Sequence, residues 1–408
     1  MRWYMGVDVS DSEYFVLVFD DEGQEVHRRK VAHSAEGLAD FGGWLNARIA
    51  DGLELFASLE RPHGRMVEIL LDHGVTVYSV NPKLLDRARD RYRPNGGHAD
   101  WFDAFVLGNS LRVDHMHLPA LRPDSEESAE LKMLTRDRLR ASQNQTRCLN
   151  LLTQTLKEYY RRPLEVFPDL KTHMALDFLR RFATPESLDK MRWGQWLKFA
   201  REHRRSDSRA REMWEQLHAP QLPVKAHIAR VHSRQLLHLV DELGIIVASV
   251  KDYDQEIERF FVTLKTVDIA RSLPVCKTGT ILPTLWAELG DAVGRWESFR
   301  HLQGYAGTTP FTKQSGKSKA VLFRYGCNKP LRYAIHWYAI HSLKKCVWSK
   351  AYHQRQLDRG RSYNQATRAL ASKWLKIIFV MWRDGVPYDE DRHLASIAKQ
   401  NINQVIAA

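Results

Sequence analysis

The sequence predicts a mixed α/β region at the amino terminus, followed by two regions that are mainly helical. In residues 1–122, short apolar strands alternate with amphipathic helices. From about residue 123 the strand pattern gives way to long helical periodicity, and the last part of the chain is strongly basic. A chain of 408 residues is too long for one ordinary core. We therefore expect three regions, 1–122, 123–268 and 269–408.

The elements of the first region follow from the spacing of apolar residues, since alternation predicts strands and 3-4 spacing predicts helices. In chain order, the strands are expected at 4–10, 14–20, 25–32, 53–60 and 75–80, and the helices at 35–49, 64–74, 81–93 and from about residue 100. Three successive strands, then strands separated by helices, predict a mixed sheet with covering helices.

Two long helices are expected in the middle region. Residues 125–160 form a polar helix with a partial apolar stripe. The second helix has apolar residues in 3-4 spacing for four heptads, at Leu236, Leu239, Leu243, Ile246, Val250, Tyr253, Ile257, Phe260 and Leu264. This pattern predicts a coiled coil or helical hairpin, with a dimer contact at Leu243 and Ile246. The alternative is an ordinary amphipathic helix packed within one chain. Residues 161–233 are expected to be helical insertions.

Positive charge is concentrated near the carboxyl terminus. The formal net charge is +12, yet residues 313–383 alone hold sixteen Lys and Arg against one acidic residue, Asp358. Tyrosines and tryptophans are interspersed among these cations. Cations bind phosphates and aromatic rings can stack on bases, so this composition predicts nucleic-acid binding. The alternative is a solvated basic face over an aromatic core.

Other features indicate a cytoplasmic protein. The amino terminus lacks the basic start and continuous apolar run of a signal peptide, and no stretch reaches the ~18 apolar residues of a membrane span. Four scattered cysteines lack metal-ligand spacing and are expected to be reduced thiols.

Four acidic residues occupy the ends of predicted elements. Asp8 lies on the first strand and Glu60 closes the strand at 53–60. Asp100 and Asp103, three apart, share one side of a later helix. Such carboxylates converge only at one end of the sheet, and a divalent cation with oxygen ligands would relieve their repulsion. The pattern predicts a Mg²⁺ site, in which two ions about 4 Å apart could hold the oxygens of a phosphodiester. Acidic residues at strand ends also occur for structural reasons alone.

The order Asp, Glu, Asp, Asp in "GVDVS", "SLERPHG" and "ADWFDA" resembles a RuvC-like, RNase H-fold domain of the DEDD type. The later "LWAELGD", "LQGYAGTTP", "QSGK" and "GCNKPLR" resemble the transposase domain of the insertion-sequence family numbered one hundred and ten, the bridge-RNA-guided DEDD serine recombinases. The resemblance spans almost the whole chain. Two stretches depart from the family pattern, "LPVCKTGTILPT" before the first of these motifs and "GGHAD" before the aspartate pair.

The resemblance implies a bacterial, nucleic-acid-associated transposase that recombines donor and target double-stranded DNA under the direction of a guide RNA. It implies a homo-oligomer, a dimer that forms a tetramer in the synaptic complex. The serine of the "SG" motif, Ser315, would form a covalent phosphoserine intermediate, in an active site completed by the four carboxylates and assembled from one or from different protomers. No His-Asp pair near Ser315 offers a triad, so its activation must come from elsewhere. The alternative for Ser315 is a turn or cap residue, with Ser318 and Thr312 as competing nucleophiles.

The basic residues around Ser315 are expected to contact nucleic acid: Lys313, Lys317, Lys319, Arg324, Lys329 and Arg332. The sequence is also compatible with two other functions. A junction-resolving metal nuclease would use water, and Ser315 would be incidental. A non-catalytic RNA-binding scaffold would retain only a relic metal site.

Overall fold

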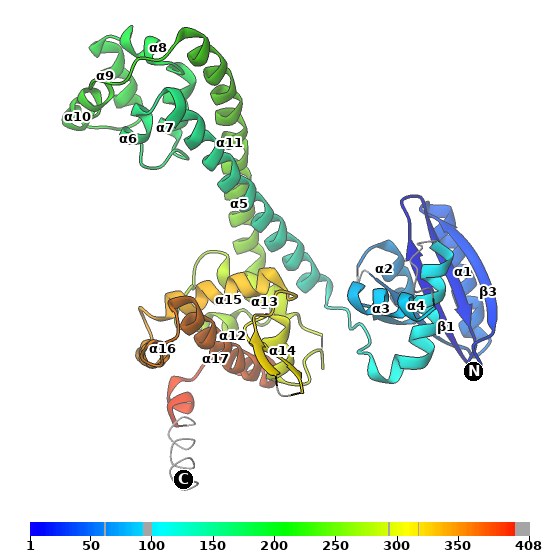
Figure 1. The fold of residues 1–408 in the computed structure, drawn as a ribbon. Coiled ribbons are helices and arrows are strands. Elements are labelled where there is room, and N and C mark those ends of the chain that lie inside the picture. Colours follow the sequence, from blue (N-terminus) through cyan, green and yellow to red (C-terminus); the bar gives the residue numbers. More distant parts are fainter. Residues whose placement is uncertain (61–62, 93–99, 293, 317, 396–408) are drawn as a thin grey trace. The chain divides into compact units, whose positions relative to one another are not determined.

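The computed structural model describes residues 1–60, 63–92, 100–292, 294–316 and 318–395 (Figure 1). It separates into two compact units, Met1–Pro123 and Asp124–Ala408. Each unit has its own hydrophobic packing.

The first unit is built on a five-stranded mixed sheet with the strand order β3-β2-β1-β4-β5. The strands are β1 (Arg2–Val9), β2 (Glu13–Phe19), β3 (Glu25–Ala32), β4 (Glu54–Leu59) and β5 (Thr76–Ser79). The first three strands pair antiparallel, whereas β4 is parallel to β1 and β5 is parallel to β4. The predicted mixed α/β fold is confirmed, and every strand lies within two residues of its predicted position.

Helices cover both faces of this sheet. They are α1 (Ala35–Ala50), α2 (Arg65–Asp72), α3 (Pro82–Tyr92), α4 (Asp100–Asp114) and the short 3-10 helix η1 (His115–His117). Met5 and Val7 of β1 pack with apolar residues of α1 and α2 on one face. The other face packs against α4, where Ala104 meets Phe15, Leu17 and Phe19 of β2. Successive side chains alternate between faces, so Tyr4, Gly6 and Asp8 of β1 all face α4.

Two glycines allow α4 to lie directly on β1. A Cβ atom at Gly6 would come within 1.9 Å of the Ala104 carbonyl oxygen and 2.4 Å of the Gly108 nitrogen. A Cβ at Gly108 would come within 2.8 Å of the Gly6 nitrogen. The obstructing atoms belong to the backbone and cannot rotate away. The close approach fixes the first turn of α4 next to the carboxyl end of β1.

Gly6→Ala is therefore expected to destabilise the first unit by about 3 kcal/mol or more, because a methyl group forces the helix off the strand. Urea unfolding followed by far-UV circular dichroism measures the loss. Gly43→Ala on α1 is the matched control, since no atom other than those of its chain neighbours and its own helix backbone lies within 4 Å of the added Cβ there. Equal stabilities for the two variants would contradict the close packing.

The second unit begins with two long helices, α5 (Glu126–Tyr159) and α11 (Ala226–Phe261), that run side by side (Figure 1). Arg138 of α5 donates a 2.8 Å hydrogen bond from Nε to Asp254 of α11. Five short helices lie between them in sequence and gather at one end of the pair: α6 (Arg162–Val166), α7 (His173–Arg181), α8 (Pro185–Asp189), α9 (Trp193–Glu202) and α10 (Asp207–Leu217). Their core centres on Trp196 and Phe178. Helical insertions are thus confirmed for this segment.

The apolar stripe of α11 packs within its own chain. Leu236, Leu239 and Leu243 join the core around Trp196, and Ile257 belongs to the core of the carboxyl-terminal helices. Leu243 is fully buried inside its own chain, and Ile246 packs beside the same core while remaining partly exposed, so packing within one chain explains the apolar stripe at these two positions. The dimer contact remains a prediction. The heptad pattern reveals which face of a helix is buried, but it does not reveal which chain covers that face.

Leu243→Asn is accordingly expected to lower the free energy of unfolding by about 3 kcal/mol or more, because it leaves a cavity and buries an amide. Thermal unfolding measures this change. The control is Ile245→Ser, because Ile245 is 70% exposed and its replacement should alter stability by about 0.5 kcal/mol at most. If the Leu243→Asn variant kept its stability but had half the wild-type mass in light scattering, the result would support a dimer contact at this position.

The remaining elements form the basic carboxyl-terminal part of this unit. They are α12 (Val267–Arg271), α13 (Ile281–Leu289), α14 (Phe299–Tyr305), β6 (Phe311–Ser315), β7 (Ser318–Leu322), α15 (Lys329–Ser342), α16 (Val347–Asp358) and α17 (Tyr363–Asp384). Trp374 and Tyr338 lie at the centre of the core. The predicted mainly helical character is confirmed, and the β6-β7 hairpin adds to it. In the described part of the chain, no helix is both long enough and apolar enough to cross a membrane.

Candidate functional site

Asp8 lies at the end of β1, on the face covered by α4. It is half-buried, and it interacts with the carboxylates of Asp103 and Asp100. Burial, followed by the charge of Asp103, raises the pKa of Asp8 from 3.8 to about 6. The Gly6 contact explains this proximity, because Ala104 and Gly108, which follow the first turn of α4, are held against the strand two residues before Asp8. The structure therefore brings three of the four predicted carboxylates together.

Asp100 and Asp103 occupy the first turn of α4, where the helix dipole favours negative charge. Asp100 is exposed and Asp103 is buried. Arg89 of α3 donates a 2.6 Å hydrogen bond from Nε to Asp103 Oδ1, and its Nη1 bonds Asp86 at 2.9 Å. The bond to Asp103 raises the pKa of Arg89, which therefore remains charged. Arg89 was not among the predicted site residues, although its position three residues after Asp86 on a basic helix marks a shared face.

Glu60 follows the last residue of β4. Strands β1 and β4 are parallel with Gly6 opposite Ser58, so Asp8 and Glu60 each lie two residues beyond this pair. Both therefore lie at the carboxyl edge of the sheet, as predicted. Glu60 is exposed, and within the described residues it has no hydrogen bond or ion pair.

Ser315 is the last residue of β6, and its register partner is Ser318, the first residue of β7. Gly316 has φ +55°, a left-handed conformation suited to the tight turn after Ser315. Every residue of β6 and β7 is exposed, including Thr312 and both serines. The hairpin thus presents Ser315 to solvent at its tip. Lys317, predicted to contact nucleic acid, lies outside the described residues.

The other predicted nucleic-acid contacts fall into two groups. Lys313, Lys319 and Lys329 are exposed. Arg324 and Arg332 are partly buried and lie over aromatic rings, Arg324 at 5.9 Å from the Phe311 centroid and Arg332 at 5.2 Å from that of Phe323. The lysines are accessible to a polyanion, whereas the two arginines also hold the base of the hairpin.

The acidic residues of the motif "LWAELGD" have structural partners. Glu288 is fully buried and accepts bonds from Arg136 Nε at 2.6 Å and Asn328 Nδ2 at 2.7 Å. Asp291 accepts a hydrogen bond from the Ser125 backbone at 2.9 Å. These contacts fasten the start of α5 to α13 and α15, so we assign this motif to packing.

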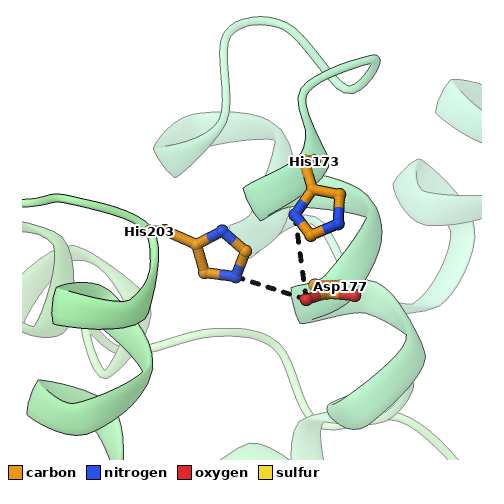
Figure 2. A group of neighbouring side chains, drawn as sticks. All are labelled: His173, Asp177 and His203. Carbon is orange, nitrogen blue, oxygen red and sulfur yellow. Dashed lines mark ion pairs between the residues drawn. The ribbon is translucent and has the colours of Figure 1, made fainter.

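A second group of metal-type ligands lies among the short helices. His173 and His203 both face Asp177 (Figure 2), with nitrogen to Oδ2 distances of 4.0 and 3.3 Å. Among the residues that the structure describes, this is the one group of three or more whose ligand atoms lie within 4.8 Å of one another. Arg180 and Arg181 also approach Asp177, at 3.8 and 3.6 Å. Protein cations already share this carboxylate, so we interpret the group as an ion-pair network between α7 and the end of α9.

The donor set of the first unit suits a hard divalent cation. It contains only carboxylate oxygens, and the raised pKa of Asp8 records the crowding of negative charge that such a cation would relieve. These carboxylates do not form a group as compact as the His-Asp-His group.

A mixed-sheet unit with clustered carboxylates at one sheet edge, followed along the chain by a basic helical unit, agrees with the DEDD-type transposase that the sequence motifs predicted. Residues 5–161 match a family model of that type, described as a transposase. Residues 268–354 match the family described as transposases of the IS116/IS110/IS902 group. The chain belongs to the IS110 family of transposases, which confirms the resemblance found in the sequence.

Individual relatives agree with this assignment. The chain is 32% identical over 203 residues to the putative transposase y4uE of Sinorhizobium fredii, a match that spans 49% of this chain and 56% of the relative. It is 26% identical to the mini-circle putative transposase for IS117 of Streptomyces coelicolor, over 97% of both chains. It is 25% identical to an uncharacterized 42 kDa protein of the insertion element IS900 of Mycobacterium paratuberculosis, over 94% of this chain and 96% of the relative.

Proposed function

We propose that this chain is an RNA-guided DNA recombinase that cuts and rejoins donor and target DNA through a phosphoserine intermediate. The observation that carries the proposal is the cluster of Asp8, Asp100 and Asp103 at the carboxyl edge of the sheet, where the pKa of Asp8 rises to about 6. Membership of a transposase family supports DNA as the substrate.

Asp8, Glu60, Asp100 and Asp103 would hold divalent metal, which we propose to be two Mg²⁺ ions. Bound there, the metal would lower the barrier by stabilising negative charge on phosphodiester oxygens. Arg89 orients the Asp103 carboxylate through its 2.6 Å bond. The contact of Gly6 with α4 holds Asp8 close to the Asp100 and Asp103 turn.

Ser315 would act as the nucleophile. Its Oγ attacks phosphorus, the new Oγ–P bond replaces one bond from phosphorus to a deoxyribose oxygen, and the serine proton passes to water. The departing deoxyribose oxygen takes up a proton. In the reverse step, a hydroxyl of another DNA strand displaces Oγ, so the phosphodiester bond is restored without an external energy source. Exposure of Ser315 at the tip of the β6-β7 hairpin supports access to a duplex.

The cations near Ser315 would position the nucleic acids. Lys313, Lys319 and Lys329 are exposed and can neutralise phosphates on either side of the attacked one. We propose the guide RNA as a second partner because the net charge is strongly positive along the carboxyl-terminal part, and we propose a homo-oligomer as the active form.

The test is a denaturing gel of purified protein, its co-purified RNA, and duplex DNA that carries the sequences specified by sequencing that RNA. With Mg²⁺, the proposal predicts protein covalently joined to DNA. Free DNA ends without an adduct would favour a nuclease that uses water. Absence of any metal-dependent cleavage would favour the RNA-binding scaffold.

A further inference from the structure

A cationic pocket lies at the base of the β6-β7 hairpin, opposite the end that carries Ser315. Its volume is about 650 Å³. The walls are the segment 307–310 that leads into β6, the end of β7 with Phe323, and one face of α17, with Tyr352 of α16 at the side. No site residue predicted from the sequence lines this pocket.

Four cations line the pocket and no carboxylate does: Arg361, Arg368, Lys373 and Lys376. Within the described residues, none of the four forms an ion pair. The last three instead lie over aromatic rings, with Arg368 at 4.5 Å from the Phe323 centroid, Lys376 at 5.0 Å from Phe299 and Lys373 at 5.7 Å from Tyr352. The pocket therefore carries concentrated positive charge on a rigid aromatic support.

This charge is costly without an anion. Lys373 and Arg368 are both partly buried, and burial is the main cause that lowers the pKa of each. Like charges add to it, from Lys376 for Lys373 and from Arg332 for Arg368. A pocket lined by cations alone is destabilised by their mutual repulsion. A bound polyanion would turn the same cations into charge-assisted hydrogen-bond donors.

We propose that this pocket binds the phosphodiester backbone of the DNA strand that Ser315 attacks, a few nucleotides from the attacked phosphate. This inference rests on the proposed function, because the choice of DNA follows from the shared hairpin. The five residues of β6 span about 13 Å, at ~3.3 Å per residue. Since one DNA strand rises ~3.4 Å per nucleotide, the pocket would hold the backbone about four nucleotides from Ser315.

The experiment measures binding without chemistry. Full-length wild-type protein, Arg368→Gln and Lys373→Gln are titrated into a fluorescein-labelled 30-base-pair DNA duplex in EDTA, over a series of salt concentrations. Each variant is expected to bind about 5- to 20-fold more weakly, and the slope of log affinity against log salt should fall in magnitude by about 1. The matched control is Lys344→Gln, which removes one exposed charge from the turn between α15 and α16 and should bind within about twofold of wild type.

Four outcomes would overturn the proposal. They are wild-type affinity in both pocket variants, a loss equal to that of Lys344→Gln, displacement of the duplex by millimolar inorganic phosphate alone, and a loss seen only with an RNA duplex of the same sequence. Thermal unfolding checks that each variant folds, and Arg368→Lys, which retains the charge, should recover most of the affinity. Suppose that the wild-type protein forms no covalent adduct, while the pocket variants bind DNA more weakly than wild type. This result would contradict the serine mechanism and support the DNA-binding pocket. Normal adduct formation by pocket variants whose DNA affinity is unchanged would contradict the proposed role of the pocket and support the recombinase.

Discussion

Asp8→Asn is expected to abolish DNA cleavage in Mg²⁺ and, at the same time, to stabilise the metal-free protein at pH 8. Cleavage fails because an amide is a poor ligand for a hard cation. Stability rises because the pKa of Asp8 is about 6 in the folded chain against an ordinary 3.8, so ionised Asp8 opposes folding above pH 6. The shift corresponds to a gain on the order of 1–3 kcal/mol.

The sign of this linkage gives a pH test. The loss of folding stability caused by ionised Asp8 is complete above pH 6. It declines as the pH falls from 6 towards 4 and is absent below pH 4. Urea unfolding in EDTA should therefore show the advantage of Asp8→Asn shrinking between pH 8 and pH 5. The control is Asp72→Asn at the end of α2, an exposed position where stability should change by about 0.5 kcal/mol at most and cleavage should persist. Near-normal cleavage by Asp8→Asn would contradict the metal site, and lower stability at pH 8 would contradict the electrostatic account.

Ser315→Ala is expected to remove the covalent joining of protein to DNA entirely, together with recombination. The change deletes the attacking oxygen but no charge and little volume, at an exposed position, so folding and DNA binding should survive. No neighbouring hydroxyl can substitute, because a displacement of even about 1 Å costs a large factor in rate. The measurement is the denaturing gel described for the wild-type protein.

Ser318→Ala and Thr312→Val are the matched controls for this experiment, since both residues lie on the same exposed hairpin. Both variants should retain substantial adduct formation. Loss of the adduct in Ser318→Ala, with its retention in Ser315→Ala, would identify Ser318 as the nucleophile. Retention in all three would exclude a nucleophile from this hairpin.

The sequence predicted the fold of the first unit well, because its strands and helices carry clean periodicities. Strand β2 is an apolar run buried along its length, and α1 repeats its apolar residues every three to four positions. The hairpin of β6 and β7 lacked such a signal. Its strands are exposed on both faces, so Lys313, Gln314 and Lys319 stand where a buried face would need apolar residues. Only Gly316 marked a turn there.

The site was partly predictable for a similar reason. Spacing in the sequence placed Asp100 and Asp103 on one side of a helix, and chain order placed Asp8 at a strand end. It could not show that Arg89, on a separate helix, would pair with Asp103, because that contact depends on tertiary packing. The sequence also could not show the pocket on α17. Its cations at 368, 373 and 376 are recognised as a pocket lining only when the folded chain places Phe299 and Phe323 beside them.

The most direct test of the proposed recombinase is to locate the protein–DNA bond itself. Wild-type protein is incubated with its co-purified RNA, the specified duplex DNA and Mg²⁺, then denatured and digested with nuclease and protease, and the peptides are sequenced by mass spectrometry. The account predicts a nucleotide attached through a phosphate ester to Ser315. A nucleotide on any other residue, or cleaved DNA with no modified peptide, would contradict it.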